Sequence, residues 1–224
     1  MKIFLHQNDL PNDIAFKKSI AVDTETMGLK TIRDRLCLVQ ISDGSNTAHL
    51  IKINDINNNS FTNLKKILWD NNLEKIFHFA RFDLAVLRYY IGPIRGPIWC
   101  TKIASKLSRT FTDKHGLSEL CKDLLNIDLP KEQQSSNWGK MILTNDQKQY
   151  AANDVIYLHK IKEELIKILN QENRLELAED TFKFLITRSS LDLSGFNEID
   201  IFAFTTIYIL TLFKNSEGIL KILF

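Results

Sequence analysis

The sequence is poor in cysteine, with only 3 in 224 residues, and CxxC or CxxH spacing is absent. Cys37, Cys100 and Cys121 are an odd, scattered set. Reduced thiols in the core therefore explain them better than disulfides or zinc ligands do. Reduced thiols imply a reducing compartment, so we expect a cytoplasmic protein.

An excess of charge of one sign is also missing, because the formal net charge is +2. This near balance argues against a large basic platform for nucleic acid, but it leaves room for a small site that takes a short anionic substrate. The apolar and charged fractions are those of ordinary soluble proteins. The length suits one α/β domain with an appendage.

Long hydrophobic runs are absent as well. The longest apolar stretch, at 201–213, is shorter than the roughly twenty residues that span a bilayer. It fits a core-packed segment, an oligomer contact or a poorly folded tail. Residues 1–5 lack the length and the small-residue cleavage site of a signal peptide. We therefore expect no membrane association.

The order of the predicted elements indicates the fold class. Strands are predicted first, at 2–6, 19–22, 36–42 and 47–53, and the last three have the spacing of an antiparallel meander. Strands at 75–79 and 98–100 then alternate with helices at 60–70, 83–90, 101–108 and 117–125. Ser60 is expected near the N-cap of the first helix. A long helical pattern at 144–169, with a possible break near Asp154, precedes a helix at 172–187. This α/β order predicts a mixed central sheet flanked by helices, with a helical C-terminal segment.

Two carboxylates follow the predicted strand at 19–22. Asp23 and Glu25 are two residues apart, so on a strand both side chains point to the same face. Two like charges at such a short distance repel each other, and a hard divalent cation that takes oxygen ligands relieves the repulsion. Taken alone, the pair also fits a plain strand end before a turn at 27–29.

Two further stretches supply carboxylates that can reach the same place. Asp83 lies at the junction of a buried strand and a helix, where it serves either as a helix cap or as a ligand at the end of the sheet. Tyr150 and Asp154 are four residues apart, on one face of a helix. The small residues Ala151 and Ala152 allow that helix to approach the sheet. The other interpretation is an amphipathic helix with a core tyrosine and a solvated acid.

Four carboxylates on three elements suit Mg²⁺ or Mn²⁺ better than zinc. Two such ions, about 3.5–4 Å apart, are a common device for in-line attack at phosphorus. A tyrosine with an ordinary pKa near 10 is a poor base at neutral pH, so we expect Tyr150 to aim the attacking water through a hydrogen bond.

Together, these motifs resemble a known family. In order and spacing, Asp23-Thr24-Glu25, His78-x-x-Arg81-Phe82-Asp83 and Tyr150-x-x-x-Asp154 resemble the three motifs of the DEDDy 3′-5′ exonucleases, the ribonuclease D group. The stretches 22–29, 75–79, 100–107, 115–117 and 133–138 are similar to the short nanoRNase C branch of alphaproteobacteria. The likeness runs from about residue 5 to residue 203.

The resemblance implies a ribonuclease H-like fold with a mixed five- or six-stranded sheet. It implies that Asp23, Glu25, Asp83 and Asp154 hold two divalent cations, Mg²⁺ or Mn²⁺, with Tyr150 orienting the water. The implied activity is 3′-5′ hydrolysis of very short RNA, chiefly 5′-phosphorylated dinucleotides, to mononucleotides. The alternative is a general ribonuclease D-like exonuclease that trims longer RNA or DNA ends.

The resemblance also suggests substrate contacts. Leu29 falls where related exonucleases insert a leucine between the last two bases, although a turn residue packed in the core is an equal alternative. The backbone of Thr24 is expected beside the substrate's 3′ end. Contacts to the 3′ nucleotide are expected from His78, Arg81 and Phe82. A 5′-phosphate clamp is expected in a donor-rich stretch, where a solvated helix face is the competing interpretation: Lys102, Ser105, Lys106, Arg109 and His115.

The division into segments follows from the same likeness. Residues 1–170 correspond to the exonuclease domain, 171–203 to a helical extension of it, and 204–224 to an apolar tail without a counterpart in the family. The resemblance implies a homo-oligomer, an octamer in the nanoRNase C branch. A catalytically dead binding or assembly protein is the contrasting hypothesis, and the intact set of acids argues against it.

Overall fold

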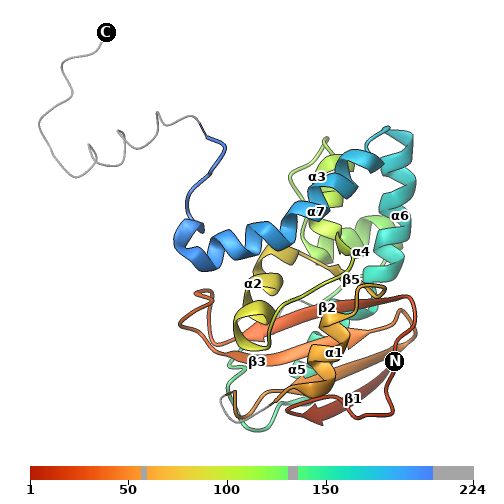
Figure 1. Ribbon diagram of the computed structural model, residues 1–224. Helices are drawn as coiled ribbons and strands as arrows, with labels where there is room; N and C mark the ends of the chain where they lie inside the picture. The colour runs from red at the N-terminus through yellow and green to blue at the C-terminus, as the bar shows by residue number, and fades with distance from the viewer. Residues whose placement is uncertain (57–59, 131–135, 204–224) are drawn as a thin grey trace, which may run out of the picture.

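A six-stranded mixed sheet forms the centre of the computed structural model, which describes residues 1–56, 60–130 and 136–203 (Figure 1). The strands are β1 (Lys2–Gln7), β2 (Ser19–Thr26), β3 (Leu36–Ser42), β4 (Thr47–Lys52), β5 (Glu74–Phe77) and β6 (Ile98–Cys100). Their order in the sheet is β1-β4-β3-β2-β5-β6. The predicted α/β class and the mixed sheet are therefore confirmed.

The predicted meander is also confirmed, because β2 pairs antiparallel with β3 and β3 pairs antiparallel with β4. The other pairs are parallel: β1 with β4, β5 with β2, and β6 with β5. The β2–β5 pairing extends only from Ser19 to Ala21 on β2. Beyond Ala21, β2 stays paired with β3 but has parted from β5. The carboxyl end of β2 is thus open on one side, which is where ligands bind in α/β sheets.

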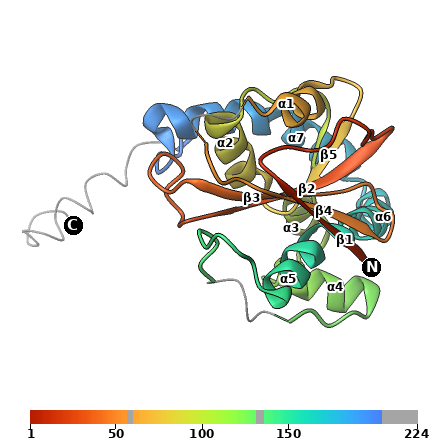
Figure 2. The ribbon, with the colours of Figure 1, turned by 90° about the horizontal axis from the view of Figure 1, so that it is seen from below.

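Helices cover both faces of this sheet. Their bounds are α1 (Thr62–Trp69), α2 (Ala80–Tyr90), α3 (Thr101–Ser108), α4 (Leu117–Leu125), α5 (Asn145–Ile156), α6 (Leu158–Gln171) and α7 (Leu175–Leu191). Figure 2 shows α1 and α2 on one side of the sheet and α5 on the other. Helix α7 packs against β6 and α6 against β5, and α3 and α4 both pack against α6 (Figure 1). Within the described ranges, no helix is both long and apolar enough to cross a membrane.

Helix α5 continues through the point where a break is predicted. Its start is held by a capping box between Thr144 and Gln147. Ala151, Ala152 and Val155 are fully buried, so packing extends the helix past Asp154. The break comes at Tyr157, between α5 and α6. As a result, Tyr150 and Asp154 lie on one continuous helix.

Ser60 lies directly before the N-cap residue of the first helix, as expected, but its side chain does not cap the helix. Helix α1 starts at Thr62, and its N-cap residue is Phe61, with a left-handed φ of 50°. The capping carboxylate comes from Asp9, which accepts the backbone N–H groups of Asn63 and Leu64 at 2.9 Å each. A capping residue so distant in sequence leaves no local pattern, which is why Ser60 was the better local choice.

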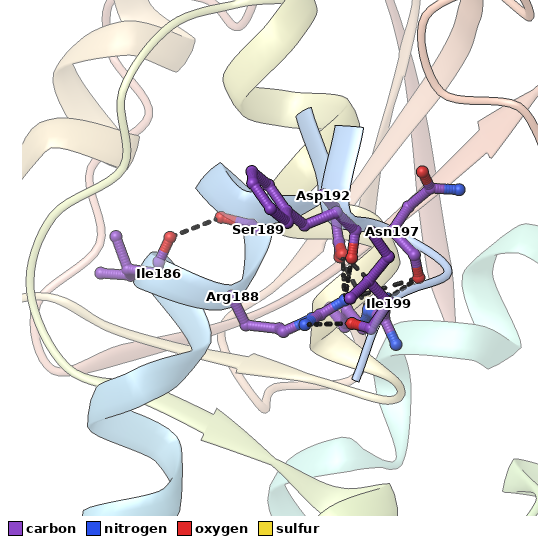
Figure 3. Close-up of polar contacts among 8 residues, drawn as sticks. Ile186, Arg188, Ser189, Asp192, Asn197 and Ile199 are labelled. Atoms are coloured by element: carbon purple, nitrogen blue, oxygen red, sulfur yellow. Dashed lines mark hydrogen bonds and ion pairs between the residues drawn. The ribbon is translucent and has the colours of Figure 1, made fainter. Parts of the chain in front are cut away.

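The C-terminal end of α7 is tied to α2. Asp192, in the short π-helical turn η1 (Asp192–Phe196), accepts two hydrogen bonds from Arg81 of α2, at 2.7 and 2.8 Å. Arg188 of α7 donates to the same carboxylate at 2.8 Å and to the carbonyl of Ile199 (Figure 3). The extension predicted at 171–203 is thus helical up to this turn. The tail predicted at 204–224 lies outside the described residues.

Candidate active site

Three carboxylates meet at the open end of β2. Asp23 and Glu25 stand on β2, and Asp154 reaches them from α5, so that one oxygen from each lies within 4.8 Å of the others. The alternation of side chains along β2 puts the two strand acids on one face, and α5 covers that face. The plain strand end that this pair alone also fits does not account for the third acid.

Asp83 approaches from the side where β5 has left β2. It lies in the first turn of α2 and is almost fully buried. Thr24, between the two strand acids, donates its hydroxyl to Asp83 Oδ1 at 2.7 Å. Phe79 makes the turn from β5 into α2 possible by adopting a left-handed φ of 72°. A capping role for Asp83 is wrong, because the N-cap residue of α2 is Phe79.

Burial raises the pKa values of all four acids, and repulsion by neighbouring acids adds to this for Asp23, Glu25 and Asp154. Burial raises the pKa of Asp83 to about 7. Burial and the charge of Asp83 raise the pKa of Asp154 to about 8. The pKa values of Asp23 and Glu25 are also raised well above normal, chiefly by burial and then by the neighbouring acids. A cluster of this kind is costly without a cation, and perturbed acids in a cleft mark functional sites.

These acids form one wall of a cavity of about 400 Å³. Of the substrate contacts expected from the sequence, the cavity includes Thr24, Leu29, His78, Phe82 and Lys102. Its other lining residues, besides the acids and Tyr150, come from the first turn of α4, from α5 and from the segments just before α2 and α4 and after α4: Phe79, Gly116, Leu117, Ser118, Glu119, Leu129, Pro130 and Asn153. The volume is within the range of small-ligand sites.

Tyr150 is positioned by packing. Its ring lies against Trp138, with ring centroids 6.1 Å apart. Burial raises the pKa of Tyr150 above its ordinary value, and the charges of Asp154, Glu25 and Asp23 raise it as well. The phenol therefore keeps its proton at neutral pH and acts through hydrogen bonds. Trp138 was missed as a supporting residue because only the fold brings it to α5.

His78 presents a neutral imidazole to the cavity. Burial, followed by the charge of Lys102, lowers the pKa of His78 to about 3. Its Nδ1 is 2.8 Å from the hydroxyl of Thr101, and that hydroxyl also donates to the carbonyl of Phe77 at 3.2 Å. Because the hydroxyl has a single proton, His78 Nδ1 is the donor to it. Nε2 is left as an acceptor.

Apolar and cationic groups form the outer rim of the cavity. Leu29 is 87% exposed, so a turn residue packed in the core is ruled out for it. The ammonium group of Lys102 lies 4.5 Å from the ring centroid of Phe79, a cation–π contact. Phe79 was missed from the sequence because its left-handed backbone, which aims the ring, has no local signal in a phenylalanine.

The remaining predicted contacts lie outside this cavity. Arg81 is committed to Asp192. Arg109 is buried and pairs with Asp123, while Ser105 bonds to His115 at 2.8 Å. Burial of Ser105 and Arg109 contradicts a fully solvated helix face. Their role in a 5′-phosphate clamp stays a prediction, as does that of exposed Lys106.

The donor set fits hard divalent cations. Asp23, Glu25 and Asp154 bring carboxylate oxygens within 4.8 Å of one another, and carboxylate oxygens are what Mg²⁺ and Mn²⁺ prefer. Asp83 is buried and the other three acids are partly buried, and bound cations would compensate the negative charge that the four carry when ionised. The arrangement is thus suited to metal-assisted chemistry at a phosphate ester.

The chain belongs to the 3′-5′ exonuclease family, whose conserved region matches residues 6–170. A solved structure of Brucella melitensis NrnC with bound Mg²⁺ is 50% identical, with a TM-score of 0.85, over 91% of this chain and 99% of that one. The same protein bound to pGG gives 51% identity and a TM-score of 0.87 over 91% and 98%. The predicted family resemblance is confirmed.

Ribonuclease D of Pseudomonas paraeruginosa is 32% identical over 161 residues, which cover 72% of this chain and 42% of that protein. The chain thus spans less than half the length of the curated ribonuclease D it matches. The region that matches the 3′-5′ exonuclease family, residues 6–170, carries all four acids and most of the sheet.

Proposed function

We propose that this protein is a two-metal-ion 3′-5′ exoribonuclease that hydrolyses very short RNA, chiefly 5′-phosphorylated dinucleotides, to mononucleotides. The observation that carries the proposal is the convergence of Asp23, Glu25, Asp83 and Asp154 at one end of a small cavity. Such a cluster repels phosphate unless cations are bound to it, so a binding protein would gain nothing from it.

The four carboxylates would hold two divalent cations, Mg²⁺ or Mn²⁺. When bound, these ions supply an activated water and stabilise the leaving oxygen. Thr24 fixes the orientation of Asp83 through its hydroxyl. The neutral phenol of Tyr150 orients the attacking water by a hydrogen bond, since its raised pKa excludes it as a base.

The rim residues would bind the nucleotides. The exposed side chain of Leu29 and the ring of Phe79 offer apolar surfaces to bases, and stacking on an aromatic ring tolerates any base. His78 Nε2 is an acceptor that suits a ribose hydroxyl. Lys102, held over Phe79, supplies positive charge for a phosphate.

The preference for dinucleotides is supported by two observations. The cavity of about 400 Å³ is small, and the chain covers 98% of a Brucella NrnC structure that holds pGG. The alternative is a ribonuclease D-like exonuclease for longer RNA or DNA ends, which the relationship to ribonuclease D supports. The two functions differ in how turnover depends on substrate length.

We further propose a homo-oligomer, an octamer by resemblance, acting in the cytoplasm. Several large apolar side chains are exposed to solvent, which supports the proposal that the protein has a surface for assembly. Phe111, Met141 and Ile142 are each more than 80% exposed. The proposed segments, an exonuclease domain at 1–170 with an extension at 171–203, would form one protomer.

The direct test of the metal-dependent reaction uses Asp154→Asn. We expect this variant to fold and to lose turnover of a 5′-phosphorylated dinucleotide in Mg²⁺ or Mn²⁺, because a ligand has been removed. Asp180→Asn, on the exposed face of α7, is the matched control and should keep full activity. Retained turnover in Asp154→Asn would contradict the metal assignment.

A further inference from the structure

The side chain of Gln40 is a buried amide that makes no hydrogen bond within the described residues. It lies in the middle of β3 and is completely inaccessible to solvent. Within the described residues, neither its Nε2 nor its Oε1 has a hydrogen-bond partner. Leaving a buried polar group unsatisfied costs about 1–3 kcal/mol, so a leucine or methionine would be more stable here. An amide kept at such a position suggests a role other than packing.

The strand register shows where that partner is. Gln40 is directly opposite Asp23 in the antiparallel β2–β3 ladder, so the two side chains lie on the same face of the sheet. Cβ atoms of directly opposed residues are about 4.5–5.5 Å apart. An amide of the length of glutamine can therefore reach the Asp23 carboxylate from the side away from the cavity.

Most other neighbours of Gln40 are apolar or already bonded; the exception is Trp138, whose buried Nε1 also lacks a partner within the described residues. Leu50 is opposite on β4, and Leu38 precedes it on the same face of β3. Both belong to an apolar cluster beneath α5 that also contains Ala151 and Trp138. Ser42, the next residue on this face, already donates its hydroxyl to the carbonyl of Thr47. Asp23 is thus the one polar group directly across the ladder from the amide.

We propose that Gln40 is a positioning residue of the acidic site. With a cation bound, its N–H group donates to an Asp23 oxygen that faces away from the cavity, and this bond, which the metal-free structure lacks, fixes the carboxylate. This inference rests on the proposed metal site and adds a residue behind the ligands. Partners behind the direct ligands commonly change metal affinity by about 10–100-fold when they are removed.

The test compares Gln40→Met with the control Ser42→Ala, two residues further along the same face of β3. Mn²⁺ binding is measured by isothermal titration calorimetry without nucleotide, and the Tm of the metal-free proteins is measured in parallel. We expect Gln40→Met to bind Mn²⁺ about 10-fold more weakly or worse while its metal-free Tm is unchanged or higher. Ser42→Ala should bind Mn²⁺ like the wild type.

Mn²⁺ affinity of Gln40→Met within twofold of the wild type would overturn the role of Gln40. Absence of Mn²⁺ binding by the wild type would instead overturn the proposed metal site itself. A crystal structure of the wild type with Mn²⁺ gives an independent answer, even if Gln40→Met does not fold. It should place Gln40 Nε2 within hydrogen-bond distance of an Asp23 oxygen, and an amide bonded elsewhere would contradict the proposal.

Discussion

Thr24 shows how one hydroxyl prepares the site. Its hydrogen bond to Asp83 lowers the pKa of that acid and so opposes the effect of burial. Without this bond, Asp83 would hold its proton more tightly and would be a poorer ligand at neutral pH. The expected place of the Thr24 backbone beside the substrate's 3′ end stays a prediction, and the contact of its hydroxyl with Asp83 adds to it.

Thr24→Val keeps the shape of the side chain and removes this bond. A hydrogen bond to a charged group contributes about 1.5–3 kcal/mol, so we expect kcat/KM to fall about 10- to 100-fold at pH 7. The loss should shrink at pH 9, where Asp83 ionises even without the bond. The pH profile of kcat/KM is the measurement, and a loss that does not vary with pH would contradict this account.

Tyr150→Phe separates the hydroxyl from the ring. The ring would still pack on Trp138, so we expect normal stability and normal Mn²⁺ binding, with kcat lower by about 100-fold. Tyr157→Phe, at the α5–α6 break, is the control and should be as active as the wild type. Weakened metal binding in Tyr150→Phe would indicate that the phenol supports the ligands rather than the water.

Helices α7 and α2 are linked by the ion pairs of Asp192. Asp192 holds Arg81 and Arg188 together, and two of these three side chains are mostly buried. Helix α2 carries Asp83 in its first turn, so the C-terminal extension supports the element that delivers one of the four acids.

Asp192→Asn leaves Arg188 without its charged partner in a mostly buried position. We expect the free energy of unfolding to fall by about 2–3 kcal/mol, as measured by urea denaturation. Asp180→Asn breaks an exposed pair on the same helix and should change stability by less than about 0.5 kcal/mol. Equal effects of the two variants would show that the Asp192 network adds nothing.

Local periodicity explains which elements and site residues could be predicted. The two-residue period of a strand placed Asp23 and Glu25 on one face, and the helical period did the same for Tyr150 and Asp154. Contacts between distant segments left no such signal: the Asp9 cap of α1 and the Arg81–Asp192 pair both depend on the finished fold. Gln40 looked like one more residue in a β-rich run.

The whole metal-free molecule should respond to pH through its acidic cluster. The pKa of Asp83 is raised to about 7 and that of Asp154 to about 8 in the folded protein, against an ordinary value of 3.8. An acid whose pKa is higher in the folded state than in the unfolded state contributes its full stabilisation when the pH is below the unfolded-state pKa. This stabilisation is lost as the pH rises through the folded-state pKa. The Tm of the metal-free protein should therefore fall between pH 6 and pH 8.5.

Asp154→Asn should flatten this dependence, and comparing it with the wild type cancels the contributions of other groups. Adding Mg²⁺ at pH 8.5 should raise the Tm of the wild type more than that of Asp154→Asn, because ligand binding stabilises the folded state. A metal-free Tm that stays constant from pH 6 to pH 8.5 would contradict the described electrostatics of the site.

Substrate length separates the proposed function from its alternative most directly. The measurement is kcat/KM for a series of 5′-phosphorylated RNAs, from two nucleotides upward, in Mg²⁺ and Mn²⁺, with matched DNA oligonucleotides alongside. The dinucleotide should be turned over fastest, with a steep fall at three and four nucleotides, because the site would enclose two. Equal or faster turnover of longer RNA would contradict dinucleotide specificity and favour a general 3′-5′ exonuclease.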